Sequence, residues 1–103
     1  MLVLYVLEHC PYCNNALKLL DENKIKYKKI VVENTEKDKN FYKKQSGMNT
    51  FPQIFLKVNK DNYLKIGGYN NLVNTLEECK SIRKTETSIE SVYYMYNFLY
   101  KNI

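Results

Sequence analysis

The chain begins with an unbroken apolar run that leads directly into a Cys-x-x-Cys motif, and this junction restricts the fold more than any other feature. Residues 2–7 (Leu-Val-Leu-Tyr-Val-Leu) are continuously apolar, which is typical of a strand covered on both faces of a parallel sheet. Pro11 suits the first turn of a helix, and Asn23 is its expected stop. The inner side of this helix is expected to carry Ala16, Leu17, Leu19 and Leu20. A strand that feeds a helix in this way predicts an α/β fold.

Three further strands are expected after this helix. Residues 25–32 form one of them, and Pro52 opens the next at 53–58. The polar turn 59–62 then returns the chain as an antiparallel partner at 63–66. A double glycine, Gly67-Gly68, ends this strand.

Three further helices are also expected. Thr35 can cap a second helix that ends at Gly47, and a third covers about 71–79. A Thr87-x-x-Glu90 motif caps the last helix, which carries Val92, Tyr93, Tyr96, Leu99 and Tyr100 at helical spacing. The order of elements predicts one domain over residues 1–103, with a four-stranded mixed sheet flanked by helices on both faces.

Composition and charge exclude several classes of function. The net charge of +5 comes from lysines spread along the chain, without a basic block or a nucleic-acid motif, so nucleic-acid binding is not expected. The apolar run at 2–7 is too short for a signal peptide, and no stretch approaches the length of a membrane span. We therefore expect a cytoplasmic protein without membrane association, in which a close cysteine pair is catalytic or metal-binding rather than structural.

The pair in Cys10-Pro11-Tyr12-Cys13 lies where the strand ends and the helix begins. Free amides and the positive end of a helix dipole favour a thiolate at Cys10. Cys13 lies one turn further into the helix, within reach of Cys10 but less exposed. The spacing predicts Cys10 as the nucleophile and Cys13 as the resolving thiol, with Tyr12 at the rim of the site.

Other interpretations of these residues carry less weight. A structural zinc site needs four ligands, and only His9 and Cys79 remain to complete one, at poor spacing, so no metal is expected. A structural disulfide is disfavoured because the chain has no export signal. His9 is either an exposed strand-end residue or an aid to the Cys10 thiolate. Cys79 is interpreted as an ordinary helix cysteine.

Three motifs in the same chain, Cys10-Pro-Tyr-Cys13, Thr50-Phe51-Pro52 and Gly67-Gly68-Tyr69, resemble the glutaredoxin family of the thioredoxin-like fold. Their order and spacing match over about residues 1–80. The resemblance implies a dithiol thiol-disulfide oxidoreductase that uses glutathione as reductant and has no tightly bound cofactor. It places Pro11, Tyr12 and Pro52 beside the catalytic cysteines.

The resemblance also implies how glutathione binds. Pro52 should follow a cis peptide bond, the Phe51 backbone should pair with the cysteinyl part, and residues 69–71 should hold the γ-glutamyl end. A double glycine before a helix also allows close approach of a ligand to the backbone. The implied glutathione-binding residues are Tyr12, Lys39, Thr50, Phe51, Pro52, Gly68, Tyr69, Asn70 and Asn71.

The chain departs from the family pattern at charged positions. Leu7 stands where members usually have Lys or Arg, and Asn49 replaces a common basic residue. Asn70 and Asn71 stand where an aspartate is frequent. We therefore expect Lys39 to carry the contact with the glycyl carboxylate, because an unpaired carboxylate is costly to desolvate.

The partners implied are disulfide-containing or glutathionylated proteins and, through glutathione, glutathione reductase; the protein is expected to be a monomer. One alternative is a redoxin of the same fold reduced by thioredoxin reductase, although the chain has no Trp and no Cys-Gly-Pro-Cys motif. Another is a non-enzymatic iron–sulfur carrier, a dimer that shares a cluster between Cys10 thiolates and glutathione. Pro11 is typical of family members that hold no cluster.

Overall fold

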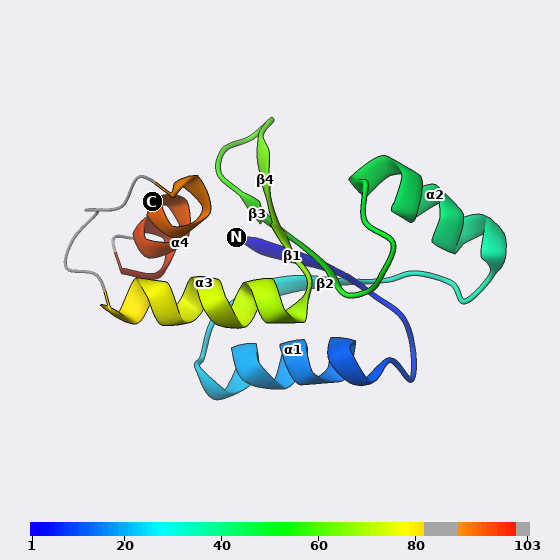
Figure 1. Cartoon of the computed structure of the whole chain (residues 1–103), viewed down its shortest axis with the longest axis horizontal. Coiled ribbons are helices and arrows are strands. Elements are labelled where there is room, and N and C mark those ends of the chain that lie inside the picture. The colour runs from blue at the N-terminus through cyan, green and yellow to red at the C-terminus, as the bar shows by residue number, and fades with distance from the viewer. Residues whose placement is uncertain (82–88, 101–103) are drawn as a thin grey trace.

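The computed structural model describes residues 1–81 and 89–100. Elements follow one another in the predicted order (Figure 1). They are β1 (Leu2–Val6), α1 (Pro11–Glu22), β2 (Tyr27–Val31), α2 (Glu36–Ser46), β3 (Gln53–Lys57), β4 (Tyr63–Gly67), α3 (Tyr69–Ser81) and α4 (Glu90–Tyr100). The capping role expected of Thr87 lies outside the described residues. The predicted α/β class is confirmed.

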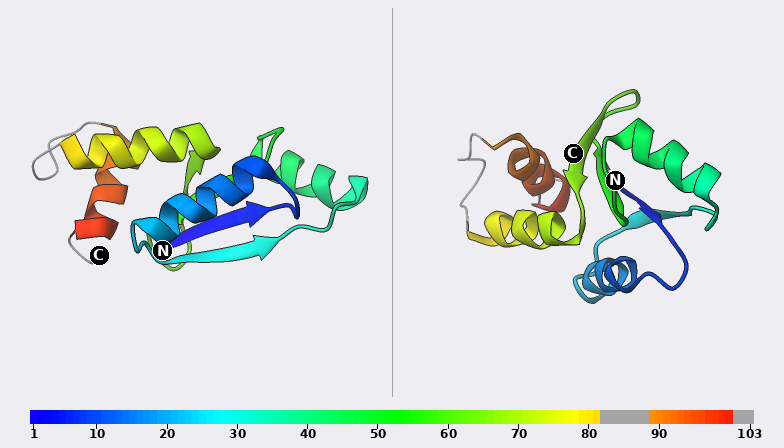
Figure 2. Two further views of the ribbon diagram at one scale, coloured as in Figure 1. Left: turned by 90° about the horizontal axis from the view of Figure 1, so that it is seen from below. Right: turned by 45° about the vertical axis from the view of Figure 1, so that its right-hand side comes forward.

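The strands form a mixed sheet in the order β2-β1-β3-β4. β1 pairs with β2 in parallel, and Figure 2 shows the two strands side by side and pointing the same way. The β1–β3 and β3–β4 pairs are antiparallel. β1 therefore has a neighbour on each side and helices over both faces, which explains why its sequence carries no polar position.

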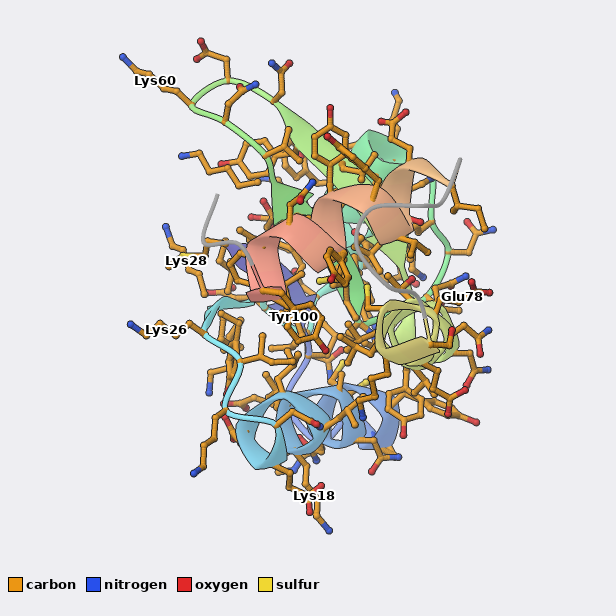
Figure 3. The ribbon with its side chains drawn as sticks, turned by 90° about the vertical axis from the view of Figure 1, so that its left-hand side faces the viewer. Lys18, Lys26, Lys28, Lys60, Glu78 and Tyr100 are labelled. Carbon is orange, nitrogen blue, oxygen red and sulfur yellow. The ribbon has the colours of Figure 1, made fainter. Side chains whose placement is uncertain are left out.

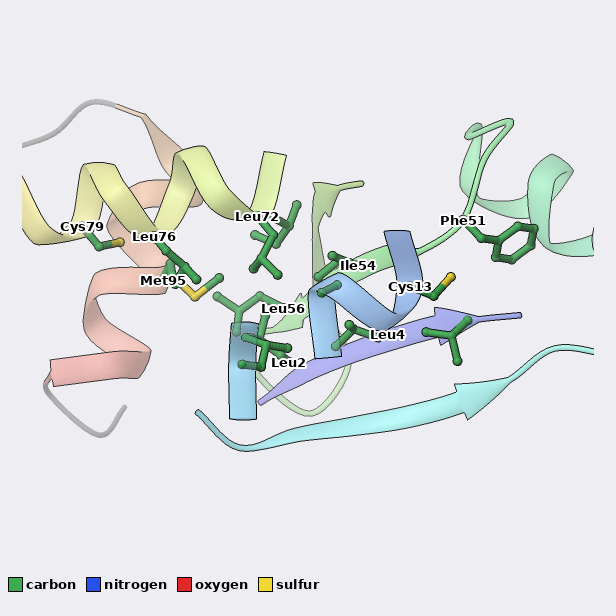
Figure 4. Packing of buried hydrophobic residues seen from close by; sticks show 14 of the residues in the cluster. Leu2, Leu4, Cys13, Phe51, Ile54, Leu56, Leu72, Leu76, Cys79 and Met95 are labelled. Atoms are coloured by element: carbon green, nitrogen blue, oxygen red, sulfur yellow. The ribbon is translucent and has the colours of Figure 1, made fainter. Parts of the chain in front are cut away.

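Helices cover the two faces of the sheet unequally. Leu4 of β1 and Ile54 of β3 point into the main core, where they meet residues of α1, α3 and α4 (Figure 4). Tyr5 faces the opposite way and contacts Tyr42 of α2, with ring centroids 5.0 Å apart. The main core consists largely of Leu2, Leu4, Val6, Ala16, Leu20, Ile54, Leu56, Leu72, Leu76 and Met95.

Local capping explains two of the helix ends. The hydroxyl of Thr35 accepts from the Asp38 N–H at 3.2 Å and starts α2 as predicted, and Gly47 ends it in a left-handed conformation. α3 begins at Tyr69, two residues earlier than predicted. The side chain of Asn71 accepts from the Gly68 N–H at 3.0 Å, so the helix starts directly after the double glycine.

The predicted stripe of α4 is confirmed in part, at Val92 and at Tyr96 and Leu99, which are partly buried against the core. Val92 and Met95 are buried against the core, whereas Tyr93 and Tyr100 are exposed. The ring centroids of Tyr96 and Tyr100 are 4.9 Å apart, and the ring planes are tilted by 54°. Helical spacing alone could not choose among the several apolar faces of this helix.

Charge is distributed around the periphery. Lys18, Lys26, Lys28 and Lys60 come from separate parts of the chain and point away from the body of the protein (Figure 3). Among the described residues, no helix combines the length and the apolar character needed to cross a membrane.

Candidate active site

Cys10 is the N-cap residue of α1. Its backbone is extended, with φ −96° and ψ 111°, and Pro11 occupies the first helical position as predicted. The N–H of Cys13 donates to the Cys10 Sγ at 3.3 Å. The sulfur therefore takes the place that a serine or aspartate oxygen has at an ordinary N-cap, where the free N–H groups of the helix stabilise negative charge.

Cys13 has a different environment from Cys10. Its side chain is buried, whereas that of Cys10 is partly exposed, and both are free thiols. Burial, together with the side-chain hydrogen bond to Cys10, raises the pKa of the Cys13 thiol to about 12. Cys13 is thus held as a neutral thiol beside a more accessible sulfur. This asymmetry suits a nucleophile and a resolving thiol.

The segment before β3 meets the cysteines from the opposite side. The Phe51–Pro52 peptide bond is cis, as predicted. The Cys10 Sγ lies 3.8 Å from the Phe51 carbonyl oxygen and donates to it as a thiol. Figure 4 places Phe51 and Cys13 at the same end of the core.

A cavity of about 360 Å³ is lined by residues next to this cysteine pair, among them Tyr12 and Phe51, but by neither cysteine. Three stretches far apart in the chain form it: the start of α1, the segment before β3 and the start of α3. Its lining consists of Tyr12, Met48, Thr50, Phe51, Pro52, Gly68, Tyr69, Asn70 and Asn71. The structure therefore brings together all the expected glutathione-binding residues except Lys39, and it adds Met48.

Two tyrosines flank the cavity. The ring centroids of Tyr12 and Tyr69 are 6.1 Å apart, and the planes are tilted by 39°. Tyr12 is 60% exposed, so it stands at the rim, as predicted, with its ring available to a ligand. Aromatic faces at this separation can pack against the peptide planes of a small ligand.

The two glycines before α3 have different tasks. Gly67 has a φ of +123°, and a Cβ placed on it would lie 2.5 Å from the Asn71 Oδ1. Gly68 has ordinary space around it, with its nearest neighbour, the Pro52 carbonyl oxygen, 3.8 Å from a built Cβ. Gly67 is required for the turn, while Gly68 lines the cavity.

Lys39 lies apart from the other expected glutathione-binding residues, so its contact with the glycyl carboxylate stays a prediction. Lys39 lies near the start of α2 and does not line the cavity. Eight residues separate it from Gly47, which corresponds to about 12 Å along a helix. Leu7 and His9 line a different cavity, between α1 and β2. Asn49 is exposed and lines neither of the two.

Gln53 is a residue that sequence reasoning missed. Its side chain is buried, and its Nε2 donates to the Met48 carbonyl oxygen at 3.4 Å. Its Oε1 is buried without a hydrogen-bond partner among the described residues. The bond ties the loop that carries Met48 and Thr50 to the first residue of β3. A glutamine at the start of a strand has no sequence pattern that predicts such a bond, so this contact could not be predicted from the sequence.

The two remaining candidate residues, His9 and Cys79, do not line the cavity. His9 is exposed, with a φ of +58°. Cys79 is buried between α3 and α4, and its thiol donates to the Val92 carbonyl oxygen at 3.6 Å. Burial raises the pKa of Cys79 to about 11. Within the ranges 1–81 and 89–100, no cluster of three or more His, Cys, Asp or Glu side chains could hold a metal ion.

Comparisons with known proteins agree with this geometry. A family model described as Glutaredoxin matches residues 2–60. Glutaredoxin 1 of Rickettsia typhi is 39% identical over 88 residues, which cover 84% of this chain and 80% of the relative. Glutaredoxin 3 of Escherichia coli is 30% identical over 69 residues, covering 67% of this chain and 77% of the relative.

Solved structures give the same fold. The solution structure of a glutaredoxin from Brucella melitensis matches with a TM-score of 0.61 and 30% identity, covering 85% of this chain and 92% of the other. A buckwheat glutaredoxin–glutathione complex matches with a TM-score of 0.62 and 24% identity, covering 77% and 70%. The predicted thioredoxin-like fold is thereby confirmed.

Proposed function

Since the chain belongs to the glutaredoxin family and is a thiol-disulfide oxidoreductase, we propose that it works with a dithiol mechanism in which glutathione is the reductant. Cys10 is the nucleophile of this proposal and Cys13 the resolving thiol. The substrates are disulfide-containing and glutathionylated proteins. The protein acts as a monomer in the cytoplasm, where glutathione reductase regenerates glutathione.

One observation carries the proposal: Phe51 contacts Cys10 and also lines the cavity. A tripeptide thiol in the cavity, lying along the Phe51 backbone, would present its sulfur beside the Cys10 Sγ. The buckwheat protein of the same fold forms a complex with glutathione, which supports this choice of ligand.

With a glutathionylated substrate, the reaction needs only Cys10. The Cys10 thiolate attacks the glutathione sulfur, a Cys10–glutathione disulfide forms, and the substrate leaves as a thiolate that takes up a proton. The thiolate of a second glutathione then attacks the bound glutathione sulfur. Oxidised glutathione leaves, and the Cys10 thiolate is restored.

With a protein disulfide, the reaction also needs Cys13. The Cys10 thiolate attacks one substrate sulfur and releases the other as a thiolate. Cys13 loses its proton and attacks the Cys10 Sγ, which releases the second substrate thiolate and leaves a Cys10–Cys13 disulfide. Two glutathione molecules reduce this disulfide and become oxidised glutathione. The buried Cys13 thiol is close enough for this step because it lies one helical turn from Cys10.

A coupled assay tests the proposal. The protein is given a glutathione mixed disulfide, glutathione, NADPH and glutathione reductase, and NADPH consumption is followed, with Cys10→Ser as the control. We expect turnover that depends on glutathione and on Cys10. Turnover with thioredoxin reductase and none with glutathione would overturn the proposal in favour of the other redoxin class.

A further inference from the structure

A second cavity, of about 290 Å³, lies between α2 and the face of the sheet that points away from the main core. Tyr5 of β1 pairs directly with Gln53 of β3, and Phe55 follows Gln53 by two positions, so these three side chains share one face of the sheet. We call this space the α2 cavity. Its lining consists of Tyr5, Tyr42, Gln45, Ser46, Gln53, Phe55 and Tyr63, none of which lines the cavity of the candidate active site.

Helix α2 covers this face of the sheet without closing onto it. None of the residues of α2 is fully buried, and the helix stands apart from α1, α3 and α4 (Figure 1). Its contact with the sheet includes the ring of Tyr42, whose centroid lies 5.0 Å from that of Tyr5. The region between the helix and the sheet is therefore an open space and not a filled core.

The walls of the α2 cavity are aromatic. The rings of Tyr5 and Phe55 meet edge to face, with centroids 5.9 Å apart and planes at 82°. Burial and the neighbouring phenols of Tyr42 and Tyr63 raise the pKa of Tyr5, so its hydroxyl stays protonated at neutral pH. Rings at these angles offer both faces and edges, which suits contact with a planar aromatic ligand.

Gln53 gives the α2 cavity an unused hydrogen-bond acceptor. Its side chain is fully buried, and its Nε2 donates to the Met48 carbonyl oxygen, which determines the orientation of the amide. The Oε1 has no hydrogen-bond partner among the described residues. A buried acceptor without a partner is costly, and a ligand that donates an N–H to it would remove that cost.

Backbone and side-chain charges around the α2 cavity favour an uncharged ligand. The last turn of α2 ends at Ser46, so carbonyl oxygens and the negative end of the helix dipole are found here, which disfavours a carboxylate. The Lys65 Nζ donates to the Ser46 carbonyl oxygen at 3.2 Å, and the Lys57 Nζ lies 5.8 Å from the centroid of the Tyr63 ring. These two ammonium groups disfavour a cation.

We propose that the α2 cavity binds an uncharged, planar aromatic small molecule that donates an N–H to the Gln53 Oε1. The volume is at the lower end for small-molecule sites, which limits the ligand to one ring or two fused rings. The amide of Gln53 also holds Met48, which lines the other cavity, so the new site borders the candidate active site without overlapping it. The inference does not depend on the proposed function.

The test compares two probes of the same shape, indole and benzofuran, in which an N–H is replaced by an oxygen. The sequence contains two glutamines, Gln45 and Gln53, so side-chain ¹⁵N labelling of glutamine in the full chain gives two amide signals. We expect indole to shift the Gln53 signal in an NMR titration. Its Kd should be about fivefold lower than that of benzofuran, the effect of one hydrogen bond. Benzoate and phenyltrimethylammonium should bind more weakly than indole.

A matched pair of variants identifies the acceptor. Gln53→Met removes the buried oxygen, whereas Gln45→Met makes the same change at the exposed rim of the α2 cavity. We expect Gln53→Met to bring the Kd values of indole and benzofuran within about twofold of each other, and Gln45→Met to keep the preference for indole. The variants also assign the two amide signals.

Four outcomes would overturn the inference. They are equal Kd values for indole and benzofuran with the unaltered protein, tighter binding of either charged probe, a shift at Gln45 without one at Gln53, and no binding of any probe. Loss of the preference in Gln45→Met but not in Gln53→Met would also contradict it. The comparison of the two rings uses the unaltered protein, so it does not depend on the variants folding. No turnover is measured, so failure of the proposed function would leave the result unaffected.

Discussion

The backbone N–H of Cys13 donates to the Sγ of Cys10 across 3.3 Å, so the resolving residue also stabilises the nucleophile. This bond uses the amide of Cys13 and not its thiol. The buried thiol, with its pKa raised to about 12 by burial and by its own hydrogen bond to Cys10, stays protonated at neutral pH. The two functions of Cys13 can therefore be separated by mutation, because a side-chain change leaves the amide in place.

The first prediction concerns this pair. Cys10→Ser should reduce turnover of every disulfide to the uncatalysed rate, because no other described thiol caps a helix. Cys13→Ser should still reduce glutathionylated substrates, since the N–H to Sγ bond persists, but should lose direct reduction of protein disulfides. Parallel assays with a glutathionylated peptide and with a protein disulfide check this. The reverse pattern would exchange the two assignments.

The second prediction follows from the buried Cys79. Burial raises the pKa of its thiol from 9.0 to about 11. Below pH 9 the thiol is protonated in both states, and its contribution to stability is complete. Between pH 9 and about 11 the unfolded chain loses the proton first, so the free energy of unfolding falls as pH rises.

Cys79→Ala should therefore show a shallower decline of unfolding free energy over this pH range than the unaltered protein. Urea unfolding at several pH values measures both slopes. Tyrosine ionisation is common to the two proteins and cancels in the comparison. Equal slopes would show that the Cys79 thiol titrates normally.

A third prediction distinguishes the two adjacent glycines. Gly67→Ala should destabilise the protein by about 1–3 kcal/mol, because its φ of +123° is unfavourable for alanine and the added Cβ meets Asn71. Gly68→Ala is the matched control and should cost much less. Thermal unfolding of both variants provides the measurement, and equal destabilisation would contradict the geometry.

The fourth prediction separates positioning from stability at Gln53. Gln53→Met removes the unpaired buried oxygen but also the bond to Met48. These effects oppose each other, so the unfolding free energy should stay within about 1 kcal/mol of the unaltered value. The KM for glutathione should rise severalfold, because the loop with Met48 and Thr50 loses its tether. An unchanged KM would leave Gln53 with a structural role only.

The last prediction returns to Lys39. Because Lys39 does not line the cavity, Lys39→Ala should change the KM for glutathione by less than about twofold, even at low ionic strength. Lys39 is the position where sequence reasoning placed the glycyl carboxylate. A rise of about fivefold, the effect of one exposed ion pair, would support that assignment.

Several parts of the fold could be predicted because their causes are local. The apolar run of β1, Pro11 at the start of α1, and the Thr35 and Gly47 caps of α2 each depend on residues within a few positions of one another. The predicted start of α3 is two residues late, because the N–H of Gly68 donates to the side chain of Asn71, three residues further on, and so caps the helix earlier. The buried face of α4 was predicted only in part, at Val92, Tyr96 and Leu99, because a helix rich in aromatic residues offers several apolar faces.

The sequence by itself determined the reactive group, since a cysteine at a strand–helix junction acquires the free N–H groups of the helix end from its immediate neighbours. Through the family resemblance, the sequence also predicted the cis peptide bond before Pro52, which the structure contains. Apart from the family resemblance, no local pattern in the sequence places Tyr12, Thr50 and Asn71 at one cavity; they come together through packing over more than fifty positions, which only the tertiary structure decides. It likewise excluded Lys39 from the lining and buried Gln53. The sequence gives the type and charge of each residue, but the packing of the helices and the sheet determines which side chains surround a cavity.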